Sequence, residues 1–230
     1  MADVAPPIRW QVVLPVKHAR DAKTRLRPPA GVSRAELARA MARDTMTAVF
    51  AELPAGQVVV VTSDDEAHDA AVRLGAQVLD DPGQGLNAAV RAGLEVCGVA
   101  VADADPEAQA VGVAVLLGDL PALRPQDLGA ALQACARHTQ AVVPDRVGTG
   151  TVLLTSTAGA IEPAFGAGSA ARHARTATVL ALDLPRLRQD VDDATDLDRA
   201  VALGLGPATS AVLHLPGSSP LSPAAPSPSP

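Results

Sequence analysis

The strongest constraint on the fold of this chain is the regular alternation of short apolar runs with segments whose apolar residues recur at helical spacing. The runs that we expect to form strands are residues 10–16, 57–62, 76–79, 111–117, 141–143, 152–155 and 179–182. The segments that we expect to form helices are 33–49, 63–74, 86–96, 125–137, 170–175 and 195–203. This alternation predicts an α/β fold, with a mostly parallel central sheet flanked by helices. The run at 111–117 is the most apolar and is expected near the sheet centre.

Several helix ends carry recognisable signals. Ser33 with Glu36, and Ser63 with Glu66, match the capping box that begins helices. Gly75 and Gly204 are placed to end helices, and Asp193 or Thr195 to begin the one at 195–203. If residues 190–192 end a strand, Asp190 and Asp192 lie on one face of it.

The domain organisation follows from composition along the chain. Residues 1–215 are expected to form a single folded domain, within which 98–109, small and acidic, form a surface connection. Residues 216–230 contain six prolines and no charged side chain, which predicts a tail without regular structure.

Charge and aromatic content exclude several classes of partner. The formal net charge is −6, and there are three aromatic residues and no Tyr, whereas nucleic-acid binding draws on basic surfaces and aromatic platforms. The longest apolar run, 110–117, is far shorter than a membrane span, and the N-terminus does not match a signal peptide. The two cysteines form no metal-binding or disulfide pattern. We therefore expect a cytoplasmic protein with no membrane or nucleic-acid partner; the sequence predicts no oligomeric state.

A basic loop follows the first expected strand. Five of the nineteen basic residues fall within residues 17–27, and Lys17 and Lys23 are the only lysines in the chain. Ligands of α/β sheets bind at the carboxyl ends of strands, where this loop begins. We expect Lys17 and Lys23 to neutralise a triphosphate and Arg25 to hold phosphate oxygens, so that all three act in catalysis. The alternative is a solvated basic loop.

Acidic residues follow two later segments. Asp119 comes directly after the most apolar strand, where a carboxylate serves as a Mg²⁺ ligand or, alternatively, as a helix cap. Either Asp190 or Asp192 could share that metal with Asp119.

Glycine-rich turns complete the set of candidate sites. Gly83 and Gly85 precede a helix and can bring backbone N–H groups against a phosphate or a base; with Ala88 they also weakly match the dinucleotide fingerprint. The turns at 148–151 and 165–169, with Arg172 and His173 close behind, are expected to cradle a small anion. These features suggest a second, acidic substrate.

The sequence lacks a G-x-S-x-G elbow, a Walker A motif and a paired Cys–His nucleophile. The reaction that remains compatible with these residues is attack of a phosphate oxygen on the α-phosphorus of a nucleoside triphosphate, with pyrophosphate as the leaving group. Such a step needs positioning and charge neutralisation rather than a protein nucleophile.

In joint order, these residues resemble the guanylyltransferases that make the phosphoanhydride precursor of the deazaflavin coenzyme F-420. The resemblance spans about Val12 to Thr209, and its carriers are residues 14–17, 22–26, 41–45, 85–89, 118–123, 145, 148–151, 165–169, 173 and 190–192. The chain departs from the family after Asp192, where Asp193-Ala-Thr195 replaces the usual Asp-Thr-Pro.

The resemblance implies a nucleotide-diphospho-sugar transferase type of fold, GTP as nucleotide donor and Mg²⁺ as cofactor. It implies that Thr151, Gly166 and Ser169 bind the phospho-acid, and that Asp119 and Asp192 bind the metal, with Asp190 in reserve. We expect the nucleotide to contact Leu14, Pro15, Lys17, Lys23, Gly85 and Asn87.

The acceptor is expected to be phosphoenolpyruvate, because the Arg- and Ala-rich composition resembles that of GC-rich bacterial genomes. The alternatives are 2-phospho-L-lactate and 3-phosphoglycerate, which the sequence does not resolve. Two other hypotheses about function stay open. The first is a nucleotidyltransferase with a molybdopterin or sugar-phosphate acceptor. The second is a nucleotide-binding module or dinucleotide oxidoreductase built around residues 83–88.

Overall fold

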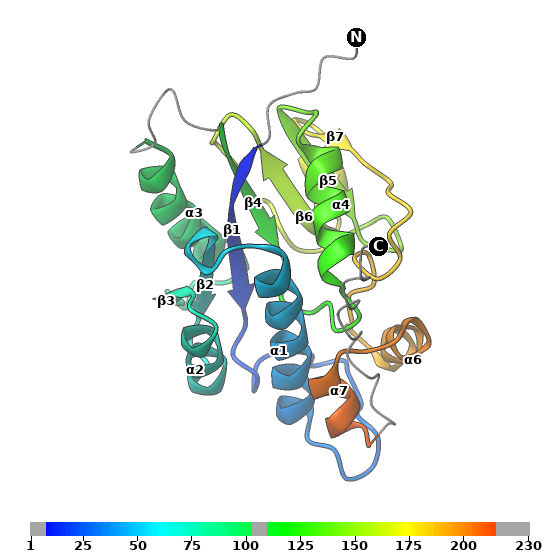
Figure 1. Cartoon of the computed structure of the whole chain (residues 1–230). Coiled ribbons are helices and arrows are strands. Elements are labelled where there is room, and N and C mark those ends of the chain that lie inside the picture. Colours follow the sequence, from blue (N-terminus) through cyan, green and yellow to red (C-terminus); the bar gives the residue numbers. More distant parts are fainter. Residues whose placement is uncertain (1–7, 103–109, 215–230) are drawn as a thin grey trace, which may run out of the picture.

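The computed structural model describes residues 8–102 and 110–214, which form a twisted sheet between two layers of helices (Figure 1). The seven strands lie in the order β3-β2-β1-β4-β6-β5-β7. Their bounds are β1 Arg9–Val16, β2 Val58–Thr62, β3 Gln77–Asp80, β4 Val111–Leu116, β5 Gln140–Pro144, β6 Thr151–Ser156 and β7 Thr178–Val179. All pair in parallel except β6, which is antiparallel to both β4 and β5. The predicted mostly parallel α/β sheet is therefore confirmed.

The helices cover both faces of the sheet. Their bounds are α1 Arg34–Glu52, α2 Asp65–Arg73, α3 Leu86–Ala102, α4 Pro125–Cys135, α5 Ser169–His173, α6 Ala194–Leu203 and α7 Pro207–Val212, with a single-turn helix at Ala55–Gln57 (η1). Leu14 of β1 belongs to the core with α1, α2 and α4, whereas its neighbour Val13 belongs to the core under α3. Strands covered on both faces need apolar residues at successive positions, which explains the unbroken apolar runs.

Glycine allows α3 to approach the sheet closely. A Cβ atom on Gly93 would lie 2.4 Å from Cγ1 of Val13, so a larger residue here would push α3 away from β1. The close approach fixes α3, and with it the turn before Leu86, at the carboxyl ends of β1 and β2.

A smaller apolar cluster holds together the basic loop, α1, the segment around Val191 and the C-terminal helices. Leu26 from the basic loop packs with Leu37 and Met41 of α1, with Val191, and with residues of α6 and the segment before α7. Because Leu26 and Val191 are both buried in this cluster, the side chains flanking them, Arg25 and Asp192, are brought together from distant parts of the sequence. Packing, rather than sheet pairing, positions this acidic segment.

Several helix starts differ from the sequence-based expectation. Ser33 precedes α1, but its side chain makes no capping hydrogen bond. The N-cap of α2 is Asp64 rather than Ser63, and its carboxylate accepts the Ala67 N–H at 3.1 Å. Asp193 caps α6 by accepting the Asp196 N–H, as expected.

Other elements also differ in extent. Residues 190–192 are irregular rather than the end of a strand, and β7 is shorter than expected. The helix at 86–96 continues to Ala102, so the first part of the expected connection at 98–109 is helical, and 103–109 lies outside the described residues. α7 follows α6 and was not expected; Asp44 of α1 accepts N–H groups from Ala208 and Thr209 at its start.

The domain prediction stays a prediction, and the expected tail at 216–230 lies outside the described residues. In the part of the chain that the structure describes, none of the helices combines the length and apolar character needed to cross a bilayer. Cys97 and Cys135 are both buried and unbonded to each other, and burial raises the pKa of each thiol to about 11.

Candidate active site

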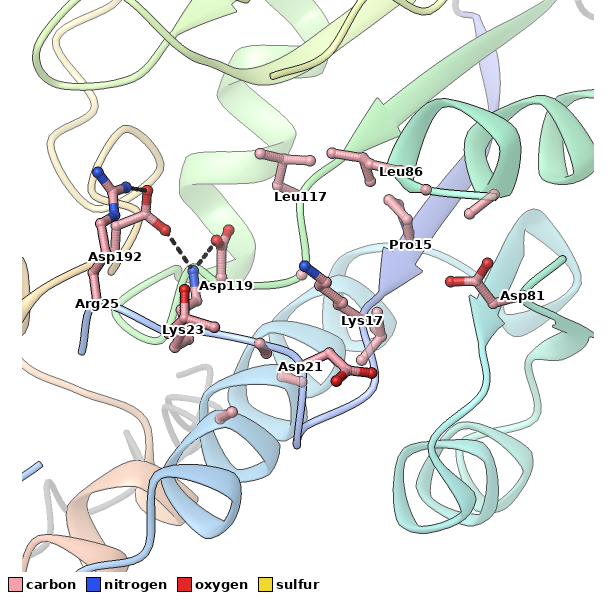
Figure 2. A pocket seen from close by; sticks show the side chains of 18 residues that line it. Pro15, Lys17, Asp21, Lys23, Arg25, Asp81, Leu86, Leu117, Asp119 and Asp192 are labelled. Carbon is pink, nitrogen blue, oxygen red and sulfur yellow. Dashed lines mark hydrogen bonds and ion pairs between the residues drawn. The ribbon is translucent and has the colours of Figure 1, made fainter. Parts of the chain in front are cut away.

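A pocket of about 380 Å³ lies at the carboxyl ends of the central strands (Figure 2). It is lined by the loop after β1, the start of α3, the residues after β4, and Asp192. The predicted site residues that line it are Pro15, Lys17, Lys23, Arg25, Gly85, Asp119 and Asp192. Residues from four distant parts of the sequence therefore meet in one cavity.

Lys23 is the centre of the charged cluster in this pocket. Its Nζ atom donates hydrogen bonds to Asp119 Oδ2 and to Asp192 Oδ1, the latter at 3.1 Å (Figure 2). Arg25 bonds the second oxygen of Asp192 at 2.6 Å. Lys23 also has a φ of 55°, a strained backbone conformation for a residue with a side chain. The loop thus turns sharply to direct this ammonium group at the two carboxylates.

The pKa values of Lys23, Asp190 and Asp192 are shifted by burial and by the charges around them. Burial alone would lower the pKa of Lys23, but the charges of Asp119 and Asp192 outweigh it and raise the pKa. For Asp192, burial is likewise outweighed by Lys23 and Arg25, so its pKa is lowered. Burial, with the charges of Asp119 and Asp192, raises the pKa of Asp190 to about 7. The positive charge beside Asp190 is therefore too small to offset its burial and its two acidic neighbours.

The same carboxylates fit a divalent metal ion. One oxygen from each of Asp119, Asp190 and Asp192 lies within 4.8 Å of the others. The Oδ1 atom of Asp119 is buried and, within residues 8–102 and 110–214, has no hydrogen-bond partner. Carboxylate oxygens are the ligands that Mg²⁺ and related hard cations prefer. Asp190 is the predicted alternative to Asp192, and the structure brings both of them close to Asp119. Residues 190–192 do not form the strand that was expected to align Asp190 with Asp192.

Asp119 is positioned by the residues on either side of it. The Leu120 N–H donates to Thr45 Oγ1 of α1 at 3.0 Å, and the Leu120 side chain is fully buried. On the other side, a Cβ atom on Gly118 would lie 3.0 Å from the Pro15 carbonyl oxygen, so the chain after β4 passes tightly against the end of β1. The alternative role of Asp119 as a helix cap is wrong, because α4 begins at Pro125 with Arg124 as its N-cap.

The basic loop is anchored at its start by Asp64. This carboxylate accepts the Ala19 N–H at 3.2 Å and the Arg39 Nε–H at 3.1 Å, besides capping α2. Lys17 is exposed in the pocket, on the same loop as Lys23. A fixed loop base with exposed cationic side chains suits an anionic ligand.

The side chains of Asn87 and Leu14, two predicted nucleotide contacts, are both engaged within the protein. The Asn87 amide accepts the Phe165 N–H at 2.8 Å and donates to the Phe165 carbonyl at 3.2 Å, so it joins the start of α3 to the loop before α5. The Leu14 side chain is fully buried in the core, which leaves only its backbone for a ligand. Neither residue is among those that line the pocket.

The residues predicted to bind the acceptor lie in β6, in the loop before α5 and at the start of α5. Thr151 begins β6, and because β6 is antiparallel its first residue lies at the edge where the parallel strands end. Gly166 is exposed with a φ of 115°, and Ser169 begins α5. The Leu117 N–H donates to the Val152 carbonyl at 3.0 Å, which connects this group to the wall of the pocket.

The turn at 148–151 is not the open anion cradle that the sequence suggested. The Asp145 carboxylate accepts the N–H groups of Gly148, Thr149 and Gly150 at 2.6–2.9 Å. Likewise, Arg172 donates to the carbonyl oxygens of Ala164 and Ala167, so that it holds a loop. The sequence did not reveal these internal partners, because they depend on the turn's fold.

Asp21 and Asp81 also line the pocket and were not singled out from the sequence. Asp81 accepts the Gly83 N–H at 2.9 Å and so shapes the glycine turn before α3. Its position two residues after the expected strand at 76–79 was the available signal.

Comparisons with known proteins show the family to which this chain is similar. The model of the family described as guanylyl transferase CofC like matches residues 10–214. A phosphoenolpyruvate guanylyltransferase of Sanguibacter keddieii is 43% identical over 243 residues, covering 89% of this chain and 84% of the relative. One of Streptomyces coelicolor is 45% identical over 210 residues, covering 89% of this chain and 96% of the relative.

Solved structures show the same fold at low identity. A nucleotide-diphospho-sugar transferase from Desulfovibrio desulfuricans has a TM-score of 0.56 at 16% identity, over 84% of this chain and 86% of that one. A 4-diphosphocytidyl-2C-methyl-D-erythritol synthase has a TM-score of 0.53 at 12% identity, over 86% and 99%. The predicted fold type and the predicted family are therefore both confirmed, and the chain belongs to the guanylyl transferase CofC-like family.

Proposed function

We propose that this protein transfers the GMP moiety of GTP to phosphoenolpyruvate, giving enolpyruvoyl-2-diphospho-5′-guanosine and diphosphate, in coenzyme F-420 biosynthesis. The observation that carries the proposal is the pocket in which Lys23 bridges Asp119 and Asp192, in a chain of the guanylyl transferase family. The relatives named phosphoenolpyruvate guanylyltransferase support the choice of acceptor. Both substrates are soluble phosphorylated metabolites, which fits an enzyme of the cytoplasm.

In this reaction, a phosphate oxygen of the acceptor attacks the α-phosphorus of GTP. A bond forms between that oxygen and the α-phosphorus, and the bond from the α-phosphorus to the oxygen bridging to the β-phosphate breaks. Both reactants are anions, so the protein must neutralise charge and align them. We assign Lys17, which is exposed in the pocket, and Arg25 to the phosphate oxygens of GTP.

Asp119, Asp190 and Asp192 are the residues that would hold Mg²⁺. When bound, the ion supplies positive charge beside the triphosphate. Lys23 holds Asp119 and Asp192 close together, and its charge helps to lower the pKa of Asp192. We assign Gly85 and the backbone of Leu14 and Pro15 to the nucleotide side of the pocket, and Thr151, Gly166 and Ser169 to the acceptor side.

The test is release of pyrophosphate from GTP with phosphoenolpyruvate, 2-phospho-L-lactate or 3-phosphoglycerate, each with and without Mg²⁺. The proposal predicts release that requires both Mg²⁺ and an acceptor, and that is fastest with phosphoenolpyruvate. Faster release with 2-phospho-L-lactate would transfer the assignment to that acceptor. No release with any of the three would contradict the proposed function.

A further inference from the structure

His173 is a buried histidine whose two ring nitrogens both have partners. Only 3% of the residue is exposed, and it lies at the end of α5, with its ring edge-on to Phe165 at 4.9 Å. Its Nε2 atom lies 2.9 Å from the Ala164 nitrogen, and its Nδ1 atom lies 2.9 Å from Thr151 Oγ1. The ring therefore connects the loop before α5 with the first residue of β6.

The backbone contact fixes the tautomer of this ring. A backbone N–H can only donate, so Nε2 must accept the Ala164 hydrogen and carries no proton of its own. A neutral imidazole then has its proton on Nδ1. Burial, together with the charge of Arg172, lowers the pKa of His173, which agrees with a neutral ring.

The tautomer determines the role of the Thr151 hydroxyl. Because Nδ1–H donates, Thr151 Oγ1 accepts, and its own hydrogen must point elsewhere. Thr151 is almost fully buried, and across residues 8–102 and 110–214 no other side-chain partner is found for this hydroxyl. Buried polar hydrogens nearly always find an acceptor. The hydroxyl is thus held as a donor for which a bound ligand can supply the acceptor.

We propose that His173 is a positioning residue of the acceptor subsite, which holds the Thr151 hydroxyl as a hydrogen donor to an anionic oxygen of the bound phospho-acid. This inference rests on the proposed function, in which Thr151 binds the acceptor. A donor in this place favours an acceptor that offers a carboxylate or phosphate oxygen there. His173 does not itself touch substrate; it acts through Thr151.

The test uses two variants that each keep one of the two hydrogen bonds. In His173→Asn the amide nitrogen lies near the position of Nδ1 and can still donate to Thr151. In His173→Gln the amide oxygen lies near the position of Nε2 and can still accept from Ala164. We expect His173→Gln to raise KM for phosphoenolpyruvate by about five- to tenfold, the effect of one hydrogen bond. We expect His173→Asn to stay within about twofold of the unchanged protein, and KM for GTP to stay within about twofold in both.

A double variant shows whether His173 acts through Thr151. Thr151→Val removes the hydroxyl and should raise KM for phosphoenolpyruvate by about tenfold or more. Adding His173→Gln to Thr151→Val should then raise it no further, because the two residues act as one unit. Additive effects, or a larger loss of acceptor affinity in His173→Asn than in His173→Gln, would overturn the proposal.

The unchanged protein offers a readout that needs no variant. Nitrogen-15 NMR of the histidine rings should show one buried ring with its proton on Nδ1, assigned to His173 by its absence in His173→Gln. A proton on Nε2 instead would overturn the proposal. If the protein transfers GMP to a different phospho-acid, KM for that acceptor takes the place of KM for phosphoenolpyruvate. Absence of transfer to every phospho-acid contradicts the proposed function, whereas the tautomer still tests the role of His173.

Discussion

At the scale of single residues, Lys23 has two partners that the sequence did not predict. A lysine at a strand end was expected to contact phosphate, yet Lys23 Nζ bonds Asp119 and Asp192. The sequence predicted the three carboxylates and both lysines, because each follows an expected strand or falls in a charge cluster. It did not predict that Lys23 pairs with these carboxylates, because the pairing depends on Leu26 and Val191 packing in the same small cluster.

We expect Asp119→Asn to lower the rate of guanylyl transfer by a factor on the order of 10² to 10³, the range seen when one strong electrostatic contact to the reacting group is lost. The amide keeps the size of the side chain but is a weak metal ligand and no longer balances the charge of Lys23. The measurement is initial-rate pyrophosphate release, with circular dichroism to check the fold.

The matched control for this prediction is Asp69→Asn, which also removes one aspartate charge. The Asp69 side chain is 68% exposed on α2 and does not line the pocket. The control should keep full activity. Equal rates for Asp119→Asn and the control would show that Asp119 does not take part in the reaction.

At the scale of helices and strands, the apolar runs were predicted well and the element ends less well. The runs at 57–62 and 111–117 correspond closely to β2 and β4, because strands buried on both faces have an unmistakable composition. The sequence did not reveal that β6 runs antiparallel, which brings Thr151 to the same edge as Asp119. The cap of α2 was misplaced by one residue, because Ser63 and Asp64 are both good capping residues and only Asp64 also meets Ala19 and Arg39.

The difference between these two neighbours gives a stability prediction. We expect Asp64→Ala to lower the free energy of unfolding by about 3 kcal/mol, because the buried carboxylate caps α2 and also bonds the Ala19 N–H and the Arg39 guanidinium. Ser63 is exposed and is not the cap, so Ser63→Ala should change stability by less than about 0.5 kcal/mol. Urea denaturation of both variants measures the difference. A similar loss in both would contradict the assignment of Asp64 as the anchor of the helix and of the basic loop.

At the scale of the whole molecule, the fold and the site have a common cause. Parallel strands that end at one edge collect the loops that follow them, and the sequence was sufficient to predict both the sheet and the set of loops. Which of those loops contact one another needed the structure. Asn87 shows why: it follows a glycine turn typical of nucleotide binding, yet its amide is bonded to the Phe165 backbone in the loop before α5.

The central claim is that this pocket transfers the GMP moiety of GTP to a small phospho-acid. The most direct test is to follow phosphorus-32 from the α-phosphate of GTP, in the presence of Mg²⁺ and phosphoenolpyruvate, and to identify the labelled product by chromatography and mass spectrometry. We expect the label to appear in a guanosine diphosphate ester of the acceptor, and label placed instead on the γ-phosphate to leave in pyrophosphate. Release of γ-label as inorganic phosphate, with the α-label retained in GDP, would contradict this claim.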